Sequence, residues 1–173
     1  MFQRTSLSGN SPWYHGETKL VRLKIGDKVP DFSLQSSTGQ KITLSHFLGT
    51  KNVVIFFYPM DESPVCSREA EAFKEKYRAF KELEGEVIGI SSQSVESHKA
   101  FASRHSLPFI LLSDVEGAVR KLYGISSTLG VVPGRVTFVI DKEGVIKCVF
   151  SSQLHPARHA EEALRALQKI VPR

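Results

Sequence analysis

The chain has two cysteines, Cys66 and Cys148, which lie far apart in the sequence. Neither belongs to a Cys-x-x-Cys motif, so a dithiol–disulfide oxidoreductase and a zinc ribbon are both disfavoured. Two distant cysteines do not make a disulfide framework, and this usage fits a reducing compartment. The chemistry to look for is therefore that of a single thiolate acting as a nucleophile.

Cys66 stands where a buried strand gives way to a helix. The strand is predicted over Asn52–Tyr58 (NVVIFFY), and the helix begins near Cys66 after a polar loop. The start of a helix offers unpaired N–H groups and the positive end of its dipole, and both favour a thiolate. Ligands also bind at the carboxyl ends of strands in open α/β sheets. The alternative is a small hydrophobic residue packed in the core, and position alone does not choose between the two.

The residues before Cys66 form a spaced motif: Pro59, three residues, Ser63, two residues, Cys66. This motif resembles the peroxiredoxin signature, in which threonine or serine occupies the middle place. Further segments, in the right order, resemble the peroxiredoxin Q (bacterioferritin comigratory protein) subgroup: Gly89–Ser91, Ser97–Phe101, Leu111–Asp114, Val119–Lys121 and Pro133–Arg135. The resemblance runs from about Leu23 to the C-terminus.

The resemblance implies a thioredoxin-like fold and the reduction of hydrogen peroxide or alkyl hydroperoxides. Cys66 matches the peroxidatic cysteine, whose thiolate attacks a peroxide oxygen and becomes a sulfenic acid. Arg135 matches the family arginine that contacts both the thiolate and the peroxide. Ser63 takes the threonine place, with its hydroxyl directed toward the peroxide.

The resemblance also assigns roles to two residues around the thiol. Pro59 is expected to shield the sulfur and to order the loop, and Glu69 matches a Glu/Gln position that organises Arg135. No cofactor and no metal ion are implied. Serine in place of threonine, and Val65 where the subgroup often has glycine, are expected to change the rate or the peroxide preference without removing the chemistry.

Many members of the subgroup have a resolving cysteine five residues after the peroxidatic one, where this chain has Glu71. Cys148 lies in the predicted strand Val145–Phe150, in which Lys147 faces solvent, so alternation places Cys148 on the buried face as core filler. We therefore expect a one-cysteine cycle in which an external thiol reduces the sulfenic acid. Thioredoxin, glutaredoxin and glutathione all remain open as that reductant. Resolution between two molecules is the weaker alternative.

Alternating strand and helix patterns predict an α/β fold with a central mixed β-sheet flanked by helices. The expected strands are Asp31–Gln35, Lys41–Leu44, Asn52–Tyr58, Glu86–Ser91, Phe109–Leu112, Val136–Ile140 and Val145–Phe150. The expected helices are Val65–Leu83, Val95–His105, Gly117–Tyr123 and Ala157–Ile170.

The 173 residues predict one domain, residues 23–173, after a flexible N-terminal extension, residues 1–22. Of the net charge of +5, residues 1–24 carry +3, from Arg4, Lys19, Arg22 and Lys24 against Glu17. Elsewhere lysine and arginine alternate with glutamate, so nucleic-acid binding is disfavoured. No apolar run is long enough to cross a membrane, and the N-terminus has no secretory apolar core. We expect a cytoplasmic monomer, or a plastid protein if a transit peptide has been removed.

The histidines complete no site that the sequence can specify. His155 and His159 are four residues apart, as helical metal ligands are, but no cysteine or carboxylate arrangement accompanies them, so surface or capping roles are predicted. His98 and His105 also lack the partners of a catalytic set. A cysteine hydrolase would need a histidine beside Cys66, which stays a minor alternative.

A second class of function stays open beside the peroxidase. The chain would then be a redox-sensing or chaperone-like binding protein that uses oxidation of Cys66 with little turnover. Retention of Pro59, Ser63 and Arg135 favours turnover, because a passive thiol does not require all three.

Overall fold

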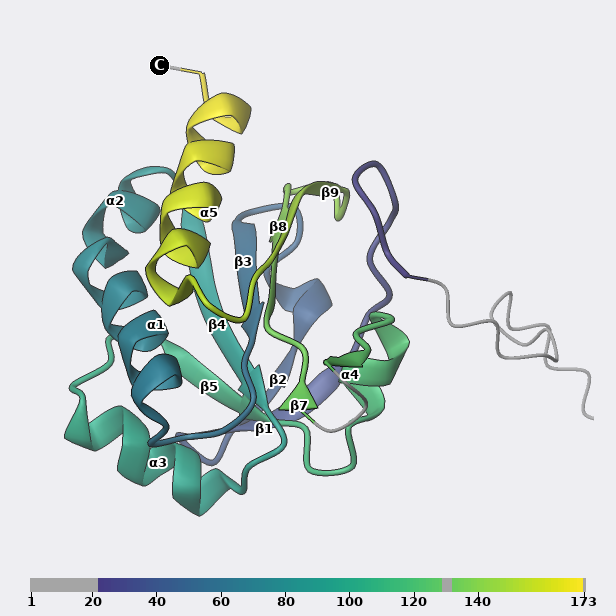
Figure 1. The fold of residues 1–173 in the computed structure, drawn as a ribbon. Helices are drawn as coiled ribbons and strands as arrows, with labels where there is room; N and C mark the ends of the chain where they lie inside the picture. Colours follow the sequence, from purple (N-terminus) through teal and green to yellow (C-terminus); the bar gives the residue numbers. More distant parts are fainter. Residues whose placement is uncertain (1–21, 129–131, 173) are drawn as a thin grey trace, which may run out of the picture.

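The computed structural model describes residues 22–128 and 132–172, so most of the predicted extension over residues 1–22 lies outside the described residues. The described chain forms a mixed sheet of seven strands with helices on both faces (Figure 1). In sheet order the strands are β2 (Lys41–Thr43), β1 (Ser33–Ser36), β5 (Ile110–Ser113), β4 (Gly85–Ser91), β3 (Asn52–Phe57), β8 (Val136–Ile140) and β9 (Ile146–Ser151). The α/β class and the central mixed sheet predicted from the sequence are confirmed.

Strands β3, β4 and β5 run parallel in the middle of the sheet, and the outer strands pair antiparallel. All six residues of β3 are buried. The continuous apolar sequence of β3 follows from this burial, because a strand covered on both faces has no solvent side. The carboxyl ends of the parallel strands lie at one edge of the sheet, and the loop that carries Pro59, Ser63 and Cys66 leaves from there.

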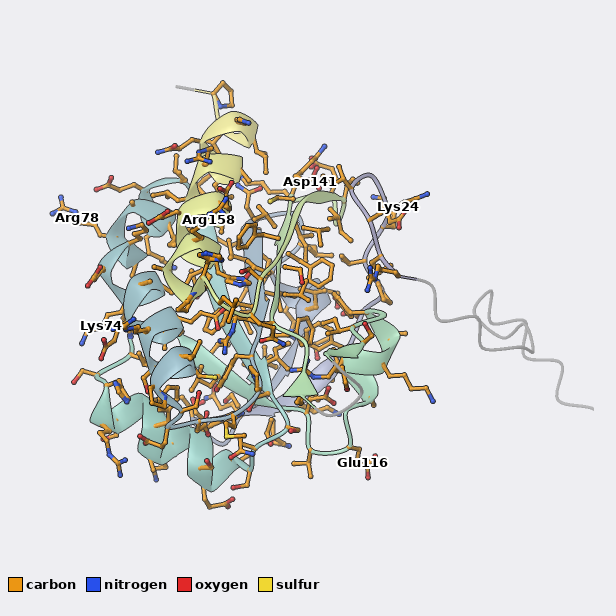
Figure 2. The ribbon with its side chains drawn as sticks, in the orientation of Figure 1. Lys24, Lys74, Arg78, Glu116, Asp141 and Arg158 are labelled. Carbon is orange, nitrogen blue, oxygen red and sulfur yellow. The ribbon has the colours of Figure 1, made fainter. Side chains whose placement is uncertain are left out.

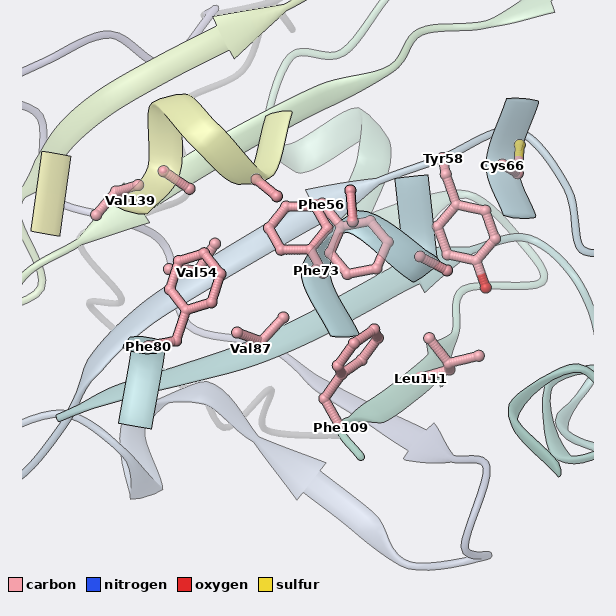
Figure 3. Close-up of a cluster of buried hydrophobic side chains, with 14 of the residues drawn as sticks. Val54, Phe56, Tyr58, Cys66, Phe73, Phe80, Val87, Phe109, Leu111 and Val139 are labelled. Carbon is pink, nitrogen blue, oxygen red and sulfur yellow. The ribbon is translucent and has the colours of Figure 1, made fainter. Parts of the chain in front are cut away.

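One face of the sheet is covered by α1 (Pro64–Glu75), α2 (Tyr77–Glu82), α3 (Val95–Arg104) and α5 (Pro156–Ile170). Stacked aromatic rings fill this layer: Phe56 of β3 lies on Phe73 of α1 with ring centroids 4.3 Å apart. Figure 3 shows this cluster running from Val139 and Val54 to Tyr58, with Cys66 at its end. The thiol therefore sits at the rim of a rigid apolar core.

The opposite face is covered by α4 (Ala118–Leu122) and a short 3-10 helix, η1 (Leu44–His46). Phe57, Tyr123 and Phe138 pack there, with ring centroids 5.4–6.0 Å apart. Successive β3 residues point to opposite faces, so Phe56 enters the first core and Phe57 the second. The two cores hold the end of β3, and with it the start of the loop, from both sides.

The single helix predicted over Val65–Leu83 is wrong, because the chain breaks at Lys76 into α1 and α2. Lys76 has φ −95° and ψ 1°, outside helical values. The break lets α2 turn onto β4 and α5 while Phe73 and Phe80 both stay buried. Apolar spacing continues through the break, so periodicity alone could not reveal it.

Charged side chains lie on the outside of the molecule. Figure 2 shows Lys74, Arg78 and Glu116 pointing outward, and the exposed pair Arg78–Glu82 spans one helical turn at 3.0 Å. Such pairs add little stability. A two-stranded ladder of β6 (Ser127–Thr128) and β7 (Val132–Pro133) was not predicted, since its strands are too short to show a pattern. Within the described ranges, no helix combines the length and apolar character needed to cross a bilayer.

Candidate active site

Cys66 lies in the first turn of α1, at the carboxyl end of β3. Ser63 is the N-cap: its Oγ accepts a hydrogen bond from the Cys66 N–H at 3.1 Å, and its carbonyl accepts one from the Ser67 N–H at 2.9 Å. Pro64 is the first helical residue, where a missing N–H costs nothing. The cap thus fixes where the helix begins, and the thiol lies where the helix dipole stabilises negative charge.

The guanidinium of Arg135 contacts both Cys66 and Glu69. Its Nη2 donates to Cys66 Sγ at 3.3 Å, and its Nη1 donates to Glu69 Oε2. All three residues are buried, and Cys66 is only 2% exposed. Burial opposes the charge of Arg135, but the neighbouring Glu69 and Cys66 outweigh it and raise the pKa of Arg135. A permanent cation therefore lies against the sulfur, away from bulk water.

Glu69 is an unusual partner for this arginine. Burial raises the pKa of Glu69 to about 8, and the Arg135 guanidinium opposes that rise only in part. Oε2 faces Arg135, whereas Oε1 has no hydrogen-bond partner among the described residues and lies 3.5 Å from His159 Nδ1. The guanidinium of Arg135 is therefore shared, with Nη1 on the Glu69 carboxyl and Nη2 on the sulfur.

The predicted surface or capping role of His159 is wrong, because its side chain is fully buried between α5 and the sheet. Its Nε2–H donates to the carbonyl of Ser152 at 2.9 Å, so Nδ1 accepts, and the Thr137 hydroxyl lies 2.8 Å from it. Burial lowers the pKa of His159 to about 4, which keeps the ring neutral. His155, by contrast, lies exposed at the start of α5.

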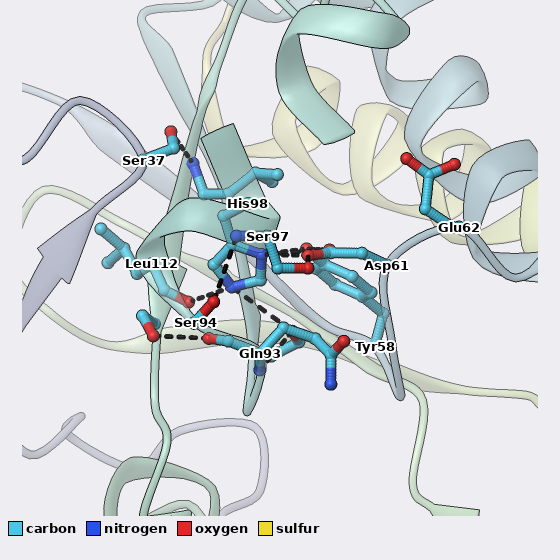
Figure 4. A network of polar contacts seen from close by, with 12 residues as sticks. Ser37, Tyr58, Asp61, Glu62, Gln93, Ser94, Ser97, His98 and Leu112 are labelled. Atoms are coloured by element: carbon cyan, nitrogen blue, oxygen red, sulfur yellow. Dashed lines mark hydrogen bonds and ion pairs between the residues drawn. The ribbon is translucent and has the colours of Figure 1, made fainter. Parts of the chain in front are cut away.

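A second buried polar cluster connects the loop before α1 to α3 (Figure 4). The Asp61 carboxylate accepts hydrogen bonds from the hydroxyls of Tyr58 at 2.7 Å and Ser97 at 2.6 Å. His98 Nδ1 lies 2.8 Å from the same carboxylate, and its Nε2 lies 3.1 Å from the carbonyl of Leu112. Nε2 of His98 also lies 3.3 Å from the Ser91 hydroxyl, so polar groups hold the imidazole ring on both sides.

This cluster holds the loop before α1 in a conformation that includes an unfavourable backbone angle. Glu62 has φ +63°, in the left-handed region that is strained for a residue other than glycine. On one side of it the buried Asp61 is held by α3, and Glu62 itself pairs with Arg104 of α3 at 2.9 Å. Burial acts to raise the pKa of Asp61, but the hydrogen bonds from His98 and Ser97 outweigh it and lower that pKa.

The surface beside the start of α1 is apolar. Met60 is 50% exposed, Val65 39% and Leu154 85%. Next to them is an open hollow of about 350 Å³, lined by Pro64, Val65, Arg68, Gln153, Leu154 and Pro156. This hollow lies beside the first turn of α1, whereas Cys66 itself is buried.

Comparison with known proteins identifies the family of this chain. The model of the AhpC/TSA family matches residues 25–149. The chain belongs to the AhpC/TSA family.

Its relatives are peroxiredoxins of the Q type. The chain is 47% identical over 146 residues to chloroplastic peroxiredoxin Q of Sedum lineare, covering 84% of this chain and 78% of the relative. It is 42% identical over 167 residues to that of Populus jackii, covering 96% and 78%. Among solved structures it resembles peroxidoxin BcpB of Mycobacterium tuberculosis (TM-score 0.80, 36% identity, 86% and 98% covered) and Xylella fastidiosa PrxQ (TM-score 0.80, 28% identity, 87% and 98% covered). The peroxiredoxin Q resemblance and the thioredoxin-like fold are confirmed, and the chain is a peroxidase enzyme.

Cys148 of this peroxiredoxin lies on β9, away from the carboxyl end of β3. It pairs with Val139 of β8, and Val139 pairs with Val54 near the start of β3, whereas Cys66 follows the opposite end of β3. A disulfide needs Cα atoms within about 7 Å. Cys148 packs against the first core but is half-buried, not fully buried as predicted, because β9 is an edge strand. Burial raises the pKa of its thiol.

Two parts of the peroxiredoxin's site escaped the sequence analysis. His159 precedes Ala163 and Leu167 at four-residue steps, so extending the predicted apolar stripe of the last helix backward would have placed it inside. Asp61 and His98 are 37 residues apart, and no local sequence pattern indicates that they pair. The five predicted site residues divide as follows: Cys66, Glu69 and Arg135 touch, Ser63 caps the helix, and Pro59 is buried in the loop.

Replacing Asp61 tests the loop anchor of this peroxiredoxin. Asp61→Asn is expected to lower the free energy of unfolding at pH 7 by about 2–4 kcal/mol, because the buried His98 loses its anionic partner. Since folding lowers the pKa of Asp61, its contribution is fully present above the ordinary value of 3.8 and is lost as the pH falls through the lowered value. Urea titrations at pH 7 and near pH 3 measure both effects.

The exposed Glu116→Gln serves as the control and should change stability by no more than about 0.5 kcal/mol. Equal stability of wild type and Asp61→Asn at pH 7, or a difference that persists unchanged in acid, would contradict the assignment.

Proposed function

We propose that this peroxiredoxin reduces hydrogen peroxide and alkyl hydroperoxides in a one-cysteine cycle, with Cys66 as the peroxidatic residue. The observation that carries the proposal is the bond from Arg135 Nη2 to Cys66 Sγ at 3.3 Å, between two buried side chains at a helix start. A cation held against a thiolate is what nucleophilic attack on an electron-rich peroxide requires.

In the first half of the cycle the Cys66 thiolate attacks one oxygen of the hydroperoxide. A sulfur–oxygen bond forms as the oxygen–oxygen bond breaks, and the departing alkoxide or hydroxide takes a proton to leave as alcohol or water. Cys66 becomes a sulfenic acid. Negative charge moves from sulfur onto the leaving oxygen, and Arg135 lies where it stabilises both ends of that shift.

Ser63 and Pro59 shape the pocket in this proposal. The Ser63 oxygen already accepts from the Cys66 N–H, so its O–H remains free to donate to a peroxide oxygen. Pro59 is buried in the loop and has no N–H that would need a partner. Glu69 holds the Arg135 side chain through Nη1, which fixes the direction of Nη2.

In the second half two external thiols reduce the sulfenic acid. The first displaces water to give a mixed disulfide with Cys66, and the second releases the reduced thiolate and leaves as the oxidised disulfide. The place of Cys148 on β9 and Glu71 at the alternative position support an external reductant. Thioredoxin, glutaredoxin and glutathione are the candidates.

We further propose that the protein works as a monomer in a reducing compartment. The plant relatives are named chloroplastic, which favours a plastid, and the cytosol is the other candidate.

Cysteine variants test the cycle. Hydrogen peroxide consumption is followed with a thioredoxin system and, separately, with glutathione and glutaredoxin. Cys66→Ser should lose essentially all turnover because the nucleophile is gone, and Cys148→Ser should keep wild-type turnover. If Cys148→Ser also lost turnover while remaining folded, Cys148 would be the resolving thiol. Absence of turnover by wild type with every reductant would favour the redox-sensing function.

The pH dependence tests the role of Glu69. Because the pKa of Glu69 is raised to about 8, the acid is neutral below that pH, and above it a carboxylate competes with the sulfur for Arg135. The second-order rate constant for peroxide should therefore fall about tenfold above pH 8 in wild type. A tenfold fall corresponds to a rise of about 1.4 kcal/mol in the activation free energy. Stopped-flow measurements between about pH 6 and 10 should show this fall, and Glu69→Gln should lack it. A fall of equal size in both proteins would contradict the assignment.

A further inference from the structure

Arg120, on the short helix α4, contacts the peptide groups that lead into two residues of the proposed site. Its Nη2 donates to the carbonyl of Tyr58 at 3.1 Å, and its Nη1 donates to the carbonyl of Gly134 at 2.7 Å. The Tyr58 carbonyl belongs to the peptide bond before Pro59, and the Gly134 carbonyl to the bond before Arg135. One side chain thus holds both segments that meet at the thiol.

These contacts lie just beyond the end of the sheet. Strands β3 and β8 pair as far as Phe57 and Val136. Past this pair one chain enters the loop toward Cys66 and the other arrives from β7, so the ladder no longer sets their separation. The planar fork of a guanidinium, with two N–H groups in fixed directions, spans such a gap.

Arg120 is itself held by Asp114 and by the ring of Phe57. The buried Asp114 carboxylate accepts hydrogen bonds from the backbone N–H groups of Val119 at 3.2 Å and Arg120 at 2.9 Å, which sets the start of α4. The Arg120 guanidinium carbon lies 5.6 Å from the centroid of the Phe57 ring, a cation–π contact. The Asp114 N–H in turn donates to the carbonyl of Ser91 at 2.8 Å, which connects this assembly to β4.

Gly134 is held firmly on its other side. A Cβ atom there would come within 2.6 Å of the Ser126 carbonyl oxygen, so the segment before Arg135 packs directly on the loop after α4. The Ser151 hydroxyl donates to the carbonyl of Arg135 at 3.3 Å. Because the segment before Arg135 is fixed, the bond from Arg120 to the Tyr58 carbonyl sets the distance between that segment and the start of the loop carrying Cys66.

We propose that Arg120 is a positioning residue for the peroxidase reaction, one that fixes the separation between the loop carrying Cys66 and the side chain of Arg135. It acts through the Tyr58 and Gly134 carbonyls and does not touch the substrate. The inference rests on the function proposed above for Cys66 and Arg135. Their contact is 3.3 Å, an ordinary distance for a sulfur acceptor, and a displacement of about 1 Å would carry it beyond hydrogen-bond range.

Three variants test the inference: Arg120→Met, Arg120→Lys and, as control, Lys121→Met on the exposed side of the same helix. Lysine keeps the positive charge but reaches only one carbonyl at a time. The rate constant of reduced protein with hydrogen peroxide should fall about 10–100-fold in Arg120→Met, and Arg120→Lys should lie closer to that variant than to wild type. Lys121→Met should match wild type.

Two further measurements separate positioning from stability. Alkylation of Cys66 by iodoacetamide should slow by a smaller factor than the peroxide reaction, since it does not need Arg135 aligned with a breaking bond. Urea titration gives the folded fraction, to which each rate constant is referred. If the methionine variant does not fold, Arg120→Lys carries the test.

Loss of stability in the Arg120 variants with an unchanged peroxide rate constant would overturn the inference, because the residue would then be only structural. Full recovery of the rate in Arg120→Lys would also overturn it, because charge alone would suffice. If wild-type Cys66 itself does not react with peroxide, the proposed function fails first. If wild type reacts and all variants match it, this inference alone fails.

Discussion

The burial of the Arg135 guanidinium between the Cys66 sulfur and Glu69 is the contact on which the rest of the structure depends. Removing a charge from water costs several kcal/mol unless its partners are well placed. Here one partner is a thiol at a helix start, and the other is a carboxyl whose pKa burial raises to about 8. The fold must therefore hold both partners against the guanidinium and keep all three side chains out of solvent.

Each element around the pocket contributes to this restraint. The Phe56–Phe73 stack holds α1 on the sheet, and the Asp61–His98 pair holds the loop before Cys66 on α3. From the other side, α5 supplies the neutral His159 behind Glu69. Because these supports come from distant parts of the sequence, the thiol environment is a property of the assembled sheet and not of the Cys66 motif alone.

The sequence carried the class of fold and most strand positions, because buried strands and amphipathic helices leave clear periodicities. Val136–Ile140 was predicted to the residue. The break at Lys76 was missed, because apolar spacing runs through it unbroken. In the site, Cys66 stood out by its position at a strand-to-helix junction, whereas Arg135 was identified only by resemblance to a family.

Residues that act through tertiary contact could not be predicted in the same way. His159 looked like half of a surface histidine pair, and its burial depends on how α5 docks on β8. Arg120 belonged to a segment noted only for its resemblance, and its two carbonyl bonds appear only when β3, β8 and α4 are assembled. Sequence patterns specify which residues enter a core, but the partners of a buried polar group depend on the relative placement of whole elements.

The central claim is that Arg135 stabilises charge at the Cys66 sulfur as the peroxide bond breaks. The most direct measurement is the second-order rate constant of reduced Arg135→Lys with hydrogen peroxide, obtained by rapid quenching and mass analysis of Cys66. Lysine keeps the charge but cannot contact Glu69 and the sulfur together in a fixed plane. A fall of about 100-fold or more, with Cys66 still open to alkylation, is the predicted result. A rate constant within a few-fold of wild type would contradict the account.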